Sequence, residues 1–176
     1  GVVWLAVSPS EQLIVYRELY CSRVTATDLA DMILNAERDD NIRYGVLDSS
    51  LWHKRGDTGP SLAEQMNQKG LRWRPSDRSK GSRVAGKNEL HRRLQVDEFT
   101  EEPRLVFFSS CINTIAQLPG IPLDKRNPED VDTNSEDHLY DALRYGIMTR
   151  PRSSLWDYNP VSHRTGFQAA DSTFGY

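Results

Sequence analysis

Residues 136–148, EDHLYDALRYGIM, are the stretch from which we interpret the fold. Leu139 and Leu143 recur at helical spacing, and Thr133 with Glu136 matches a capping box. The pattern predicts an amphipathic helix over 136–148, with its apolar side facing a core. A turn-rich segment precedes this helix, which is the last regular element predicted in the chain.

The polar side of the predicted helix carries two acids. Asp137 and Asp141 lie within about 40° of each other on a helix, opposite the leucines. Like charges at this spacing repel, but a shared Mg²⁺ or Mn²⁺ would favour them, since carboxylates are preferred ligands of both ions. The alternative is a solvated helix face whose acids suit the helix dipole. Asp48 lies at the end of a predicted buried strand and is a third candidate ligand. His138 could assist proton transfer or have a structural role.

The remaining elements alternate between strands and helices, which predicts an α/β or α+β domain with a mixed sheet. Apolar β-branched runs predict strands at 2–7, 13–20, 44–48 and 105–108. Helical spacing and capping signals predict a helix over 25–38 capped by Thr25 or Thr27, one between Ser61 and Gly70 with a Ser61–Glu64 capping box, one over 88–94 with Leu90 and Leu94 inward, and one over 110–118. Residues 69–84 are expected to form a loop.

Charge is concentrated in one segment. The 176-residue chain has a net charge of −3, but residues 69–93 contain nine Lys or Arg against two acids. Such a basic stripe is typical of phosphate contacts, although a solvated cationic surface gives the same pattern. The expected DNA-binding residues are Arg72, Arg74, Arg78, Lys80, Arg83 and Lys87.

Several classes of protein are excluded by composition. No apolar stretch approaches the roughly 18 residues of a membrane span, and the N-terminus lacks the features of a signal peptide. Cys21 and Cys111 have no nearby Cys partners, so neither a disulfide scaffold nor a cysteine zinc site is indicated, and we expect a reducing, intracellular location. The sequence has no G-x-S-x-G elbow or Walker A loop. Residues 151–176 lack periodicity and are expected to be an extended or disordered tail.

The run PEDVDTNSEDHLYDALRYGI at 128–147 resembles the C-terminal nuclease domain of the large terminase subunit of tailed bacteriophages. The upstream pieces agree in order: VVWLAV and LIVYREL, then YGVLDSS, the basic segment, and RLVFFSSCINTIAQL. The resemblance covers residues 1–150, which we expect to form one domain.

The resemblance implies an RNase H-like, or RuvC-like, fold with a central mixed sheet flanked by helices. It implies a nuclease that cuts concatemeric double-stranded DNA with two Mg²⁺ or Mn²⁺ ions. Asp48 would be the strand-borne acid, Asp137 or Asp141 another metal ligand, and His138 auxiliary. The implied partners are the portal protein, the small terminase subunit and an ATPase domain in the same chain, in the cytoplasm of a bacterial host and not in a membrane.

One departure from the family is visible. The family's first acid lies on a first strand resembling D-W-G, and this sequence has no such element. We therefore expect a fragment of a longer protein that lacks that strand. Two alternatives remain: a non-catalytic module for DNA docking or motor assembly, and a RuvC-like resolvase acting on branched DNA.

Overall fold

The hairpin at the start of the chain separates two cores. The computed structural model describes residues 1–54, 56, 59–132 and 135–149. Strands β1 (Val2–Val7) and β2 (Leu13–Leu19) pair antiparallel, and β5 (Leu105–Phe107) joins β2 in parallel, giving the order β1-β2-β5. Side chains along β1 alternate, so Trp4 packs into one core while Leu5 packs into the other. A strand buried on both faces is typical of sheets covered by helices on two sides.

A second sheet consists of two short parallel strands, β3 (Gly45–Leu47) and β4 (Trp73–Pro75). The 3₁₀ helix η1 (Ser49–Trp52) and helix α2 (Leu62–Gln68) connect them. Gly45 is required here because a Cβ at this position would lie 2.4 Å from the ring of Trp73. The ring can therefore pack directly over the backbone of β3.

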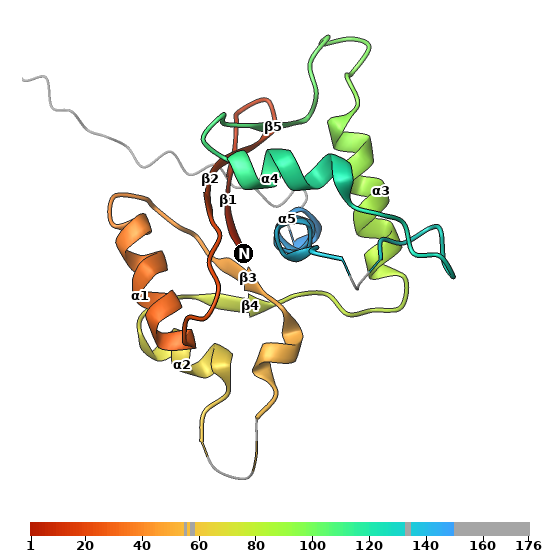
Figure 1. Cartoon of the computed structure of the whole chain (residues 1–176). Helices are drawn as coiled ribbons and strands as arrows, with labels where there is room; N and C mark the ends of the chain where they lie inside the picture. Colours follow the sequence, from red (N-terminus) through yellow and green to blue (C-terminus); the bar gives the residue numbers. More distant parts are fainter. Residues whose placement is uncertain (55, 57–58, 133–134, 150–176) are drawn as a thin grey trace, which may run out of the picture.

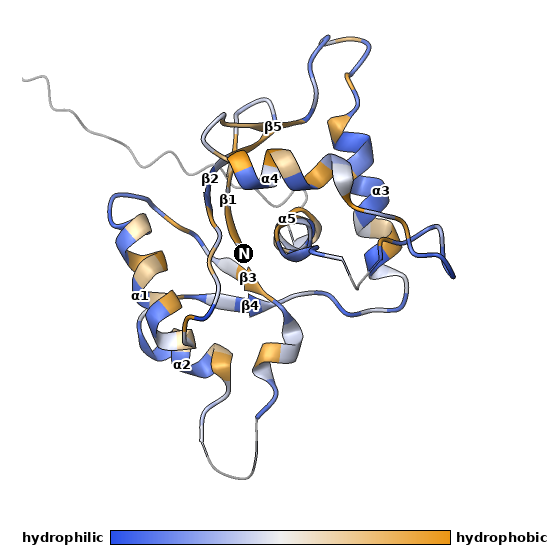
Figure 2. Cartoon of the chain, viewed as in Figure 1, coloured by the Kyte–Doolittle hydropathy of each residue, from blue (hydrophilic) through white to orange (hydrophobic). Residues whose placement is uncertain are grey.

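Helices cover the sheets on both sides. Helices α1 (Ala26–Glu37) and α2 lie on one side, and α3 (Ser82–Leu94), α4 (Ile112–Gln117) and α5 (His138–Thr149) lie on the other, with the 3₁₀ helix η2 (Leu118–Gly120) after α4 (Figure 1). Apolar residues are concentrated along the hairpin strands, whereas much of α3 is hydrophilic (Figure 2). Among the described residues, no helix combines the length and apolarity needed to cross a bilayer.

Most predicted elements are confirmed, and the chain is a mixed α/β protein with a small mixed sheet flanked by helices. Thr25 caps α1, and Ser61 forms the predicted capping box with Glu64. Gly70, which follows α2, has a φ of +111°, a conformation that suits glycine at the end of a helix. The predicted tail at 151–176 and the predicted cap Thr133 lie outside the described residues.

Four predictions were wrong in detail. Residues 69–84 are not only a loop, because they contain β4 and the first turn of α3. α3 begins at Ser82, six residues before the predicted start. This start gives no capping signal in the sequence, because the cap is Gly81, which has no side chain to accept a hydrogen bond. Leu94 was expected inward but is 40% exposed, and α5 begins at His138 instead of Glu136.

Two glycines let α5 lie close to its neighbours. A Cβ at Gly146 would lie 2.4 Å from Leu5 Cδ1 of β1. A Cβ at Gly86 of α3 would lie 2.5 Å from Arg144 Cγ of α5. These contacts hold α5 against the hairpin on one side and against α3 on the other.

We predict that Gly86→Ala destabilises the protein by about 1–2 kcal/mol through overpacking. Helix propensity alone predicts the opposite, because Ala is favoured over Gly by ~1 kcal/mol within a helix. Arg144 is buried and cannot move away easily. Urea unfolding is the measurement, and Asn88→Ala, at an exposed position of the same helix, is the control. A stabilised Gly86→Ala variant would contradict the close contact.

Candidate functional site

Asp48 lies where the chain leaves β3 and is fixed by local hydrogen bonds. It caps η1, and its Oδ1 accepts a hydrogen bond of 2.7 Å from the backbone of Ser50. Ser76, just after β4, accepts from the backbone of Ser49 at 3.1 Å and donates its own backbone N–H to Leu47 at 2.8 Å. The carboxylate is therefore presented at the carboxyl ends of two parallel strands, where α/β sheets commonly bind ligands.

The two acids of the last helix lie at its start. Asp137 immediately precedes α5, and its carbonyl accepts from the backbone of Asp141 at 2.8 Å. Leu139 and Leu143 on the opposite side are fully buried. The burial of these leucines turns both carboxylates towards α3. His138, between the two acids, is exposed.

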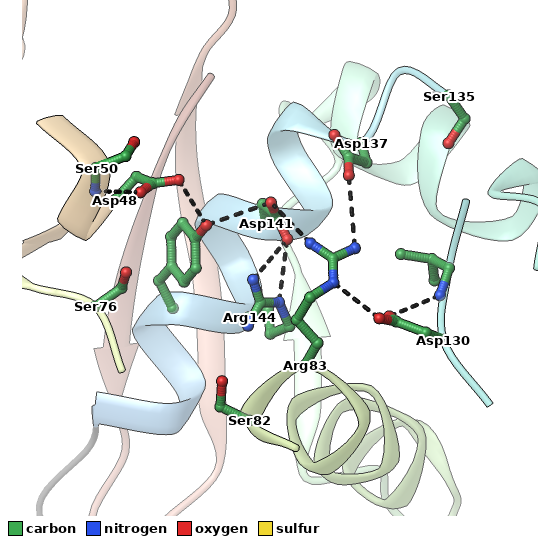
Figure 3. Close-up of polar contacts among 12 residues, drawn as sticks. Asp48, Ser50, Ser76, Ser82, Arg83, Asp130, Ser135, Asp137, Asp141 and Arg144 are labelled. Carbon is green, nitrogen blue, oxygen red and sulfur yellow. Dashed lines mark hydrogen bonds and ion pairs between the residues drawn. The ribbon is translucent and has the colours of Figure 1, made fainter. Parts of the chain in front are cut away.

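Tyr145 brings Asp48 and Asp141 together. Its hydroxyl lies 3.0 Å from Asp48 Oδ2 and 3.3 Å from Asp141 Oδ2 (Figure 3). The hydroxyl has a single proton, so it donates to one carboxylate at a time. Two acids 93 positions apart in the sequence thus converge on one oxygen atom. Sequence reasoning missed Tyr145, although its position one turn after Asp141 is a usable signal.

Two arginines lie among these acids. Arg144 donates to Asp141 Oδ1 from Nη2 at 2.8 Å and from Nε at 3.1 Å. Arg83 of α3 donates from Nε to Asp130 at 2.9 Å, and its Nη atoms lie 3.7 Å from Asp141 and 3.9 Å from Asp137 (Figure 3). We define the acidic cluster as Asp48, Asp130, Asp137 and Asp141. A guanidinium group, that of Arg83, therefore lies among the carboxylates of this cluster.

The acids of the cluster differ in their pKa values. Burial would raise the pKa of Asp48, but hydrogen bonds from Ser50 and Tyr145 outweigh burial and hold this pKa below its usual value. The pKa of Asp137 is raised, mainly by burial and then by the nearby charge of Asp141. Burial and the two neighbouring carboxylates also raise the pKa of Tyr145, so its hydroxyl keeps its proton at neutral pH.

The predicted DNA-binding residues fall into two groups. Arg72, Arg74, Arg78 and Lys80 are exposed along β4 and the loop that follows it. Arg78 lies close enough to Asp48 to lower the pKa of that carboxylate. Arg83 points into the acidic cluster, and Lys87 is buried with its Nζ 3.3 Å from the carbonyl of Pro128. Of the exposed group, Arg78 lies beside the acids, whereas the guanidinium of Arg74 lies 4.2 Å from the centre of the Tyr44 ring.

A side-chain cation already lies among the predicted metal ligands. Carboxylates are suitable donors, and Asp48, Asp137 and Asp141 do face one region. However, across the described residues no group of three or more His, Cys, Asp or Glu is placed to hold a metal ion. The guanidinium of Arg83 lies between Asp137 and Asp141.

Comparison with protein-family models, curated protein sequences and solved structures found no match to this chain. The interpretation of the site therefore rests on its own geometry and on the resemblance of the sequence motifs.

We predict that Asp137→Asn stabilises the protein at pH 7. The folded-state pKa of Asp137 lies above the unfolded value, so the ionised side chain costs stability at neutral pH. This cost is absent below the unfolded pKa, where the group is protonated in both states. Urea unfolding should show a gain at pH 7 that shrinks towards about pH 4. Asp39→Asn, at an exposed acid, is the control. A less stable Asp137→Asn variant at pH 7 would mean that attraction to Arg83 outweighs burial.

Proposed function

We propose that this chain is the nuclease domain of a large terminase subunit of a tailed bacteriophage, which cuts double-stranded DNA with the help of Mg²⁺ or Mn²⁺. The observation that carries the proposal is the convergence of Asp48 and Asp141 on the hydroxyl of Tyr145. Exposed Arg78 and Lys80 lie on the loop beside this point, where a DNA phosphate would be attracted. The proposed partners are the portal protein, the small terminase subunit and an ATPase domain, in the host cytoplasm.

The proposed fold is RNase H-like, and two open strand edges support it. In the described part of the chain, β1 pairs only with β2, and β3 pairs only with β4. Both β1 and β3 pack against α5, and side chains of both belong to the core around Trp4. One further strand between β1 and β3 would join the two sheets and satisfy both edges. We propose that this strand is the family's first strand, with its acid facing Asp48.

The residues of the site have distinct proposed roles. Asp48 and Asp141, with Asp137, would supply carboxylate oxygens to the metal, whose chemistry when bound is phosphodiester hydrolysis. Tyr145 orients Asp48 and Asp141 relative to each other. Arg72, Arg74, Arg78 and Lys80 would contact the DNA backbone.

We predict that Asp48→Asn abolishes Mn²⁺-dependent nicking of plasmid DNA and leaves DNA binding unchanged. Asn cannot supply a carboxylate, but its side-chain oxygen still accepts from Ser50 and Tyr145, so the fold is preserved. Nicking should be measured in this chain and in a version extended upstream of Gly1, with Asp39→Asn as the matched control. Cleavage retained by Asp48→Asn would overturn the assignment.

A second candidate function is a DNA-docking module without catalysis. It is favoured by the guanidinium of Arg83, which already neutralises part of the acidic cluster. DNA binding without nicking, in both this chain and the extended version, would support this candidate against the nuclease.

We predict that the double variant Arg78→Gln, Lys80→Gln lowers DNA affinity and reduces the salt dependence of binding. Each lost phosphate contact removes about one unit from the slope of log K against log salt, so the slope should fall by about two. Fluorescence anisotropy with a duplex at several salt concentrations measures this slope. Arg38→Gln, at an exposed cation at the end of α1, should leave it unchanged. An unchanged slope in the double variant would exclude this surface.

A further inference from the structure

Arg83 occupies a position that local helix preferences disfavour. It lies in the first turn of α3, where the helix dipole favours acids, and this turn contains no acid. The cap, Gly81, supplies no side-chain hydrogen bond. The position of the guanidinium is therefore explained by its long-range contacts to Asp130, Asp137 and Asp141, not by the helix.

Those contacts are uneven in strength. Nε makes a good hydrogen bond of 2.9 Å to Asp130. The contacts to Asp141 and Asp137, at 3.7 and 3.9 Å, are too long for hydrogen bonds. Nη2 is buried and has no hydrogen-bond acceptor among the residues that the structure describes. Arg83 is thus fixed at Asp130 and only loosely held by the two acids of α5.

The charges of the acidic cluster do not balance. Three of its carboxylates, Asp130, Asp137 and Asp141, are contacted by two guanidinium groups, those of Arg83 and Arg144, while Asp48 lies near Arg78. Arg144 is fully engaged, with two hydrogen bonds to Asp141 Oδ1, and is buried. Arg83 is partly exposed, at 31% of its side chain, and its contacts to the acids of α5 are long, so it is the more weakly held of the two arginines.

We propose that Arg83 is a resident counter-cation that competes with a divalent metal ion for Asp137 and Asp141. While the guanidinium lies between these acids, it blocks the metal. Metal binding requires the guanidinium to move away from Asp137 and Asp141, and its hydrogen bond to Asp130 can be kept. This inference rests on the proposed function, because it concerns regulation of the proposed metal site. It accounts for the guanidinium group that lies near both Asp137 and Asp141.

Metal binding itself, not cleavage, tests the proposal. Mn²⁺ is titrated into the protein, and free Mn²⁺ is followed by electron paramagnetic resonance. Arg83→Gln should bind Mn²⁺ about tenfold more tightly than the unsubstituted chain, which corresponds to about 1.4 kcal/mol. Arg83→Met, neutral and similar in length, should behave in the same way if Arg83→Gln folds poorly. Arg83→Lys keeps the charge and should stay close to the unsubstituted chain.

The controls separate local competition from a general change in charge. Arg92→Gln removes the same charge from an exposed position of α3 and should change Mn²⁺ affinity far less than Arg83→Gln. Asp141→Asn should weaken binding, since it removes a proposed ligand. Thermal unfolding of each variant establishes that it is folded.

Each outcome has a distinct meaning. The proposal is supported if the neutral Arg83 variants bind Mn²⁺ more tightly and Arg83→Lys and Arg92→Gln do not. Equal or weaker binding by the neutral Arg83 variants, with Asp141→Asn still impaired, overturns the proposal but leaves the metal site in place. Weaker binding by these variants would mean that Arg83 holds the acids in position. Absence of Mn²⁺ binding in every variant overturns this proposal together with the metal-dependent nuclease.

Discussion

The packing of α5 against the hairpin is the contact on which the rest of the arrangement depends. α5 lies against both β1 and β3, so it connects the two sheets within the described residues. Leu139 and Leu143 are fully buried in this contact, and each such side chain contributes about 1.5–3 kcal/mol through burial. Gly146 allows the helix to approach Leu5 without a side chain between them. The rotation of α5 about its axis is fixed as a result.

The fixed rotation of α5 also creates the electrostatic problem at its start. With the leucines facing the hairpin, Asp137 and Asp141 must face α3 and lose part of their hydration. Buried carboxylates are costly unless cations or hydrogen bonds compensate for the lost water. Arg144 compensates Asp141 directly, and Arg83 lies close to both acids. The arginines are therefore a consequence of the same packing that buries the leucines.

The sequence was most informative where signals are local. The spacing of Asp137 and Asp141 predicted their shared helix face, and the apolar run before Asp48 predicted its place at the end of a strand. β4 was missed because Arg74 and Pro75 make it unlike a strand in isolation, and it forms only by pairing with β3. Arg83 was assigned to DNA because its charge belongs to a basic segment. Its inward direction depends on Asp130, 47 residues away, which no local pattern reveals.

Two acids of the acidic cluster, Asp48 and Asp137, differ in how well the fold stabilises their charges. Asp48 receives hydrogen bonds that lower its pKa, so its charge is stabilised by the fold. Asp137 has a raised pKa, and its nearest described cation lies 3.9 Å away, so its charge is poorly compensated. A purely structural cluster would gain stability by replacing Asp137 with a neutral residue. A carboxylate held at a cost to stability, beside a cation that is loosely bound, is compatible with the proposal that a metal ion binds here.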